Sequence, residues 1–172
     1  FYLYITIRLF LKVSKLYFKN NSLNTMSKFY ISSSNFEEGK EIPKKFGYKH
    51  GNQVPEILFF NQPENTKGLA LIMDDPDAMA AVGKVWLHWL AYGSINPGNV
   101  NFGNLLVSGK TDFGEIGYGG PAPPDKRHTY IFKGYALDIV LDLKKGFSKQ
   151  ELEDAMKGHI IAESKLTGTF TP

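Results

Sequence analysis

A chain of 172 residues, with 42% hydrophobic and 22% charged residues, has the length and composition of one folded domain. It contains no cysteine, which excludes disulfide bonds and thiolate chemistry. The net charge of +3 comes from the first 25 residues, because removing their four uncompensated basic charges leaves −1. The remaining lysines are interspersed with acidic residues, so we predict no nucleic-acid-binding surface.

The first 25 residues differ in character from the rest. Their apolar stretch, residues 1–11, is interrupted by Arg8 and is shorter than the roughly 20 apolar residues that span a bilayer. Its basic residues follow the apolar stretch, whereas in a signal peptide they precede it. We therefore predict an N-terminal extension over residues 1–25, a single domain over residues 26–172, no transmembrane segment and a cytoplasmic location. An amphipathic anchor at a membrane surface is the alternative.

Short runs of apolar residues, or of alternating apolar and polar residues, predict β-strands along the chain. Strands are expected at residues 57–60, 69–73, 84–92 and 129–137, with a shorter one at 141–143. The run at 69–73 is apolar throughout, which is typical of a strand buried on both faces.

Strict alternation assigns the side chains of two of these strands to faces. In residues 84–92, one face is expected to carry Trp86, His88, Leu90 and Tyr92, and the other Val85, Leu87, Trp89 and Ala91. At residues 129–137, one face is expected to carry His128, Tyr130 and Phe132. Each strand therefore presents a histidine among aromatic residues.

One helix is clearly indicated near the C-terminus. Ser148 and Glu151 have the spacing of a capping box, flanked by Phe147 and Leu152 as a hydrophobic staple. An apolar stripe follows at helical spacing, made by Leu152, Ala155, Met156, His159 and Ile160. Many short strands with one late helix predict an all-β-dominated fold, a β-sandwich of two antiparallel sheets with a C-terminal α-helix and short connecting helices.

The turn Asp-Asp-Pro-Asp-Ala at residues 74–78 follows the buried strand directly. Pro76 favours extended geometry at Asp75, and Asp77 is expected only to bond the local backbone. Asp75 has two interpretations: it caps the turn, or it meets His88 from the next strand. In the second case the carboxylate would favour an imidazolium, and the pair could hold a phosphate.

Residues 117–124, Gly-Tyr-Gly-Gly-Pro-Ala-Pro-Pro, form an unusual loop just before His128 and Tyr130. Its glycines allow close backbone approach, and its prolines make the exit rigid. Such a loop could present backbone N–H groups to an anion. The alternative is a long connecting loop without a binding role.

Several motifs in order give the chain a resemblance to the phosphatidylethanolamine-binding protein (PEBP) family, in particular its bacterial and archaeal Raf-kinase-inhibitor-like branch. The matching segments are residues 69–78, 85–89, 111–124, 128–130, 135–138 and 158–163. The sequence departs from the family pattern at Met79, where proline is usual, at Thr129, where arginine is usual, and at residues 93–95, where one residue is added. The resemblance covers residues 26–172.

The resemblance implies a β-sandwich with a small pocket for a phosphate-like anion or phospholipid headgroup. It assigns ligand binding to Asp75, His88, Pro123, Pro124, His128 and Tyr130, and the pocket wall to Ala78, Pro121 and Ala122. It brings no cofactor, no metal and no established catalysis, and it suggests a kinase or protease as a protein target.

Two alternatives use other chemistry. In a hydrolase, Asp75 with His88 or His128 would act as acid and base, although the chain has no Gly-x-Ser-x-Gly motif and no cysteine nucleophile. A metal-dependent version would use the same three side chains as ligands. A structural reading treats the aromatic residues as a partner interface.

Overall fold

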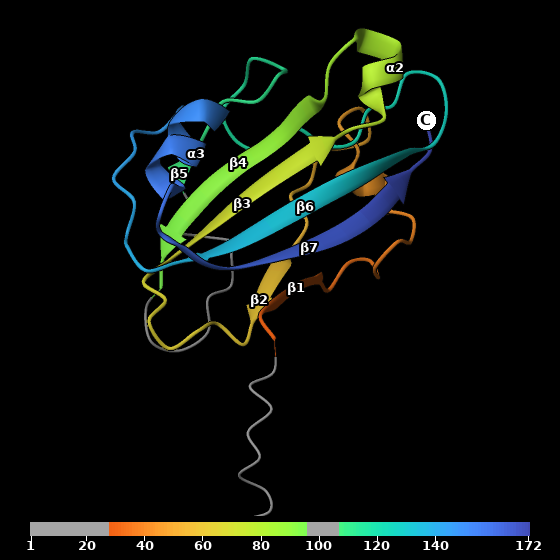
Figure 1. Cartoon of the computed structure of the whole chain (residues 1–172). Helices are drawn as coiled ribbons and strands as arrows, with labels where there is room; N and C mark the ends of the chain where they lie inside the picture. The colour runs from red at the N-terminus through yellow and green to blue at the C-terminus, as the bar shows by residue number, and fades with distance from the viewer. Residues whose placement is uncertain (1–27, 96–106) are drawn as a thin grey trace, which may run out of the picture.

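The computed structural model describes residues 28–95 and 107–172, so the predicted extension over residues 1–25 and its boundary lie outside the described residues. The described strands form two antiparallel sheets, which confirms the predicted all-β-dominated fold (Figure 1). The two-stranded sheet pairs β1 (Tyr30–Ser33) with β2 (Ile57–Phe60). The five-stranded sheet has the order β5 (Val107–Ser108), β4 (Trp86–Ser94), β3 (Gly68–Asp75), β6 (His128–Leu137) and β7 (Ile160–Phe170). Within the described residues, three short helices lie between the strands: η1 (Lys44–Phe46), α2 (Ala78–Val82) and α3 (Lys149–Met156).

Both faces of the five-stranded sheet are covered by apolar residues. On one face, Ile31 of β1 and Phe59 of β2 pack in one cluster with Leu71 of β3. On the other face, Leu152 and Met156 of α3 belong to a second cluster. The central strand β3 is buried at every position, as its apolar run predicts. Each fully buried aliphatic side chain contributes about 1.5–3 kcal/mol to folding, so this strand is a rigid base for whatever its end carries.

A β-bulge in β4 makes the prediction of strict alternation wrong. The register passes from Met73 opposite Trp89 to Asp74 opposite Leu87, which leaves His88 as the extra residue. Leu87 therefore packs in the cluster of the α3 face, and His88 turns to the same side as Trp89, toward the aromatic residues of the opposite face. The bulge is what aims the His88 ring at the end of β3.

The C-terminal helix has the predicted start but ends earlier than predicted. The capping box between Ser148 and Glu151 is present. The helix ends at Met156, and Gly158 adopts a φ of 81°, a conformation that breaks a helix and favours glycine. Residues 160–170 then form β7, an 11-residue strand, because their β-branched residues pair along β6. His159 bonds Asp138 instead of joining a helical stripe, and residues 141–143 form no strand.

Candidate functional site

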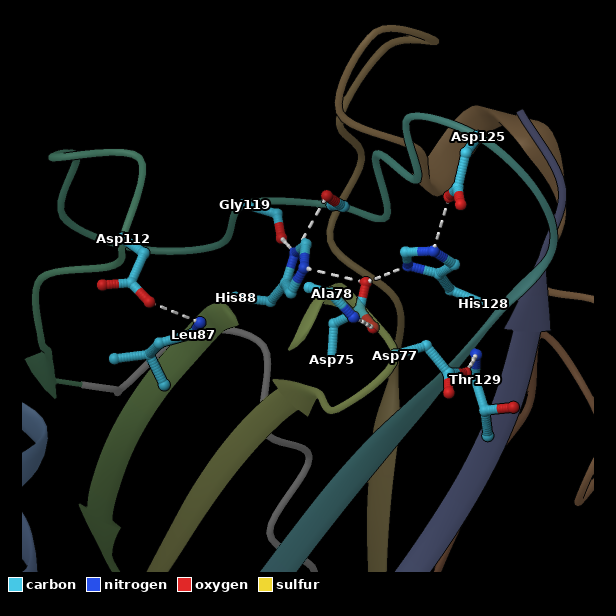
Figure 2. Close-up of polar contacts among 11 residues, drawn as sticks. Asp75, Asp77, Ala78, Leu87, His88, Asp112, Gly119, Asp125, His128 and Thr129 are labelled. Carbon is cyan, nitrogen blue, oxygen red and sulfur yellow. Dashed lines mark hydrogen bonds and ion pairs between the residues drawn. The ribbon is translucent and has the colours of Figure 1, made fainter. Parts of the chain in front are cut away.

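The end of β3 meets the beginnings of β4 and β6, because β3 pairs antiparallel with both. This topology brings together Asp75 of β3, His88 of β4, and His128 and Tyr130 of β6. Figure 2 shows the Asp75 carboxylate between the two imidazole rings, with the loop that carries Gly119 and Asp125 above them. The predicted convergence of these distant segments is therefore present in the fold.

Asp75 is buried, and its two carboxylate oxygens have different partners. Oδ1 accepts a hydrogen bond from the backbone N–H of Ala78 at 3.1 Å, which caps the turn into α2. Oδ2 lies 2.8 Å from His128 Nδ1 and 4.0 Å from His88 Nε2. The interpretation of Asp75 as a turn cap therefore holds, while its other oxygen bonds His128 and only lies near His88.

His128 is held between two carboxylates. Its Nδ1 bonds Asp75, and its Nε2 lies 3.0 Å from Oδ1 of Asp125 in the preceding loop. Burial disfavours the charged ring, but the hydrogen bonds and charges of both carboxylates outweigh burial and raise the pKa of His128. Both ring nitrogens of His128 therefore face carboxylate oxygens, an arrangement that favours the imidazolium form.

His88 is held in the opposite charge state. Its Nδ1 donates to the carbonyl oxygens of Gly119 at 2.7 Å and Gly120 at 3.0 Å, which fixes the tautomer. Burial lowers the pKa of His88 despite these carbonyls and the charge of Asp75. The expectation that Asp75 makes His88 an imidazolium is wrong for the free protein, because the 4.0 Å separation leaves no hydrogen bond to repay desolvation.

Tyr130 places its hydroxyl near the Asp75 carboxylate, but without the geometry of a hydrogen bond. Its ring is fully buried and meets the His88 ring edge-on, with centroids 5.1 Å apart. Its hydroxyl is buried without a hydrogen-bond partner among the described residues. Burial, followed by the charge of Asp75, raises the pKa of this phenol, so it keeps its proton. Buried donors without a partner are rare in folded proteins.

The glycine loop approaches His88 with its carbonyl oxygens, not with its amides. Gly119 N–H donates to the backbone of His88 at 2.8 Å, and Gly120 N–H donates to the side chain of Asn52 at 2.7 Å. The prediction that these N–H groups face an anion is therefore wrong. A Cβ at Gly120 would lie 2.0 Å from the carbonyl oxygen of Phe46, so this close packing requires glycine.

The remaining predicted site residues surround this centre unevenly. Ala78, Pro121 and Pro123 are buried, Ala122 is half-buried, and Pro124 is exposed. Pro121 ties the loop to the neighbouring segment through its carbonyl, which accepts from Tyr48 N–H.

Several residues at the site were not singled out from the sequence. Asp125 was missed, although a carboxylate three residues before His128 can fold back onto it. The Phe113 ring meets the rings of both His88 and Trp86 edge-on, with ring centroids 5.4 Å apart in each case. Phe113 lies in a segment that matches the family, but it was not assigned to the site. Trp86 Nε1 is a second buried donor without a described partner.

Asp77 bonds a residue far along the chain, whereas the sequence predicted only a bond to the local backbone. Its carboxylate accepts from the backbone N–H of Thr129 at 2.7 Å, so the turn after β3 is joined to the start of β6 (Figure 2). On the other side, Asp112 accepts from Leu87 N–H at 2.8 Å and pairs with Lys84 at 2.8 Å. These contacts hold the strand ends in place around the two histidines.

The geometry gives no support to the catalytic alternatives. Asp75 forms no hydrogen bond with His88, and His128 uses both nitrogens on carboxylates, so neither pair is arranged as a free acid and base. Within residues 28–95 and 107–172, no group of three or more histidine, aspartate or glutamate side chains has the arrangement of a metal site.

A family model described as phosphatidylethanolamine-binding protein matches residues 32–171. The chain belongs to this family. It is 40% identical over 146 residues to a UPF0098 protein of Chlamydia muridarum, covering 81% of this chain and 97% of the relative. It is 39% identical over 145 residues to a UPF0098 protein of Methanothermobacter thermautotrophicus, covering 78% of this chain and 93% of the relative.

Solved structures agree with this assignment. The PEBP homologue CT736 of Chlamydia trachomatis matches with a TM-score of 0.72 and 36% identity, over 83% of this chain and 96% of that one. Escherichia coli YbcL, described as a member of the mammalian PEBP family, matches with a TM-score of 0.73 and 25% identity, over 84% of this chain and 98% of that one. The resemblance of the sequence motifs to the PEBP family is therefore confirmed. In the part of the chain that the structure describes, no helix is long and apolar enough to cross a membrane.

Proposed function

We propose that the pocket formed by Asp75, His88, His128 and Tyr130 binds a phosphorylated small molecule or headgroup that also carries a hydrogen-bond donor. The observation that supports this most strongly is the buried hydroxyl of Tyr130, which has no described partner and stands beside His88. A phosphoryl oxygen would satisfy this donor, whereas an apolar ligand would leave it unpaired at a cost of about 1–3 kcal/mol.

The charges of the side chains around the site also restrict which ligand is expected to bind. His128 carries one positive charge against the carboxylates of Asp75 and Asp125, while His88 is neutral. This cluster has a net negative charge, which disfavours a simple dianion. It favours a zwitterion, such as phosphoethanolamine, or a phosphate that keeps one proton. In either case the ligand offers a donor to Asp75 and an acceptor to Tyr130.

Binding should also be coupled to protonation. His88 Nε2 faces the same space without a hydrogen, because the hydrogen of the neutral ring is on Nδ1. A phosphoryl oxygen at Nε2 favours the imidazolium, so binding draws a proton onto His88. Affinity is therefore expected to rise as the pH falls from about 8 to about 6.

Thermal unfolding with added ligand tests the proposal. Phosphoethanolamine should raise the melting temperature more than equal concentrations of ethanolamine or inorganic phosphate. At about 100 times the dissociation constant, the stabilisation reaches about 2.7 kcal/mol. Tyr130→Phe should remove most of this gain, whereas Tyr30→Phe, which changes an exposed hydroxyl, should retain it. Equal gains in the two variants would contradict the proposal.

The wall positions Ala78, Pro121, Ala122, Pro123 and Pro124, and a kinase or protease as the protein target, stay predictions from the resemblance. The loop over the two histidines supports them indirectly, since its prolines make it rigid and keep the proposed binding groups in place.

A further inference from the structure

A hollow of about 330 Å³ lies on β6 and β7. Its lining residues are Lys28, Lys133, Tyr135, Glu163, Ser164 and Lys165. Along β6, Lys133 and Tyr135 alternate with buried residues such as Tyr130, which lies beside His88. Lys133 and Tyr135 therefore point to the opposite side of the sheet. Lys133 is also five residues from His128, about 17 Å along a strand. The two sites are therefore separate.

Two of the lysines stand directly opposite each other. Lys133 of β6 pairs in register with Lys165 of β7, which forms one edge of the sheet (Figure 1). The backbone groups of Thr167 and Thr169 point away from β6, since they bond Gly39 and Lys40. Lys165 is two residues before Thr167, so its backbone groups also point away from β6. Its pair with Lys133 is therefore a non-hydrogen-bonded pair, in which the two side chains lie closer together. Like charges in such a pair destabilise a sheet unless an anion lies between them.

Carboxylates within the protein neutralise these lysines only partly. Buried Asp74 pairs with Lys133, but it also pairs with Lys149 of α3 at 3.2 Å. Lys28 and Lys165 form no ion pair with any residue of the described ranges. Glu163 is the single carboxylate among the lining residues, so the lining carries an excess of positive charge.

A neutral donor adds to the lysines. Burial, with the negative charges of Glu163 and Asp74, raises the pKa of Tyr135 to about 12. Its hydroxyl therefore keeps its hydrogen at neutral pH. Three lysines and a tyrosine line the hollow, although the ammonium group of Lys133 also bonds Asp74. Such a donor-rich lining is complementary to an oxyanion with several oxygens.

We propose that this hollow is a second binding site, which takes a small phosphoryl anion. A phosphoryl group between Lys133 and Lys165 would screen the repulsion between these two facing lysines, and Lys28 adds a third positive charge to the lining. Tyr135 donates to a remaining oxygen. A phosphoryl group suits the three lysines because its oxygens spread two negative charges in several directions. The proposal does not depend on the function of the histidine pocket.

Binding of inorganic pyrophosphate to the full chain tests this site. Calorimetry and amide chemical shifts should show binding that perturbs Ser164 and Lys165. The double variant Lys28→Gln/Lys165→Gln should weaken this binding by about tenfold or more. The control Lys110→Gln/Lys145→Gln removes the same charge from exposed lysines outside the hollow and should change affinity by less than about twofold.

The outcomes separate the alternatives. Equal weakening in both double variants would show general charge attraction and overturn the proposal. So would shifts confined to the residues around His88, or no pyrophosphate binding. In His88→Ala, binding at the hollow should persist, so failure of the histidine pocket and failure of this site are distinguishable.

Discussion

Asp74 and Asp75 are neighbours at the end of β3, equally buried, yet they face opposite sides of the sheet and meet different partners. Asp74 pairs with the ammonium groups of Lys133 and Lys149. Asp75 faces the imidazoles of His88 and His128. Lysines stay charged at all physiological pH values, whereas imidazoles titrate near neutrality. The chemistry of the partners, not burial or residue type, separates the titratable groups around Asp75 from the permanently charged lysines around Asp74.

The largest expected effect comes from Asp75→Ala. This change leaves the His128 imidazolium without its buried partner and removes the acceptor that caps the turn at Ala78. Because His128 can lose its proton, we expect destabilisation near the low end of the range for a broken buried pair, about 3 kcal/mol. Urea unfolding at pH 7 measures it. A loss below about 1 kcal/mol would show that Asp75 is not a structural anchor.

Asp74→Ala should cost less, about 1–2 kcal/mol. The side chains of Lys133 and Lys149 are 28% and 33% exposed, so both ammonium groups can turn to water when the carboxylate is removed. The same unfolding experiment applies, and phosphoethanolamine should still stabilise this variant. Loss of that stabilisation would contradict the separation of the two faces.

The pH dependence of stability should distinguish the two aspartates. The folded pKa of His128 is raised, so its contribution is complete below the unfolded value of about 6.5 and is lost as the pH rises through the folded pKa. The folded pKa of His88 is lowered, so stability is lost as the pH falls below about 6.5. Unfolding of Asp74→Ala between about pH 5 and pH 8 should show both losses.

In Asp75→Ala, the loss on the alkaline side should shrink, because the first of the two carboxylates that raise the pKa of His128 is gone. If this variant lost as much stability with rising pH as the protein with Asp75, Asp75 would not hold the proton of His128.

The smallest effect is expected for Asp125→Asn. Asp125 is half-exposed, and its ion pair with His128 is open to solvent. The change should lower the pKa of His128 without unfolding the protein, since Asp75 still holds the other nitrogen. Imidazole chemical shifts measure this. A pKa of His128 equal to that of the unchanged protein would show that Asp125 does not act on the ring.

Local patterns predicted the strands that carry the site, but not the irregularities that aim its side chains. The apolar run of β3, the alternation in β6 and the capping box of α3 are each encoded within a few residues. The bulge at His88 depends on how β4 pairs with β3, so no local pattern reveals it. The start of β7 was mistaken for the end of a helix because it continues the stripe of α3. Of the three residues between the two elements, only Gly158 marks the break.

The candidate site was likewise predicted where it depends on local motifs, and missed where it depends on long-range contacts. The motifs and the resemblance brought together Asp75, His88, His128 and Tyr130. They did not reveal that His88 is neutral, since that follows from burial and from the carbonyls of Gly119 and Gly120. Long-range partners such as Asn52 and Phe113 were likewise missed, because they reach the site only through the fold.

The most direct test is an NMR titration of the imidazole rings of His88 and His128, with and without phosphoethanolamine. The proposed site predicts that His128 titrates above the ordinary value of about 6.5 and His88 below it in the free protein. It also predicts that the ligand raises the pKa of His88 as a phosphoryl oxygen meets Nε2. A His88 ring whose resonances and pKa do not respond to the ligand, or which titrates above His128 in the free protein, would contradict the account.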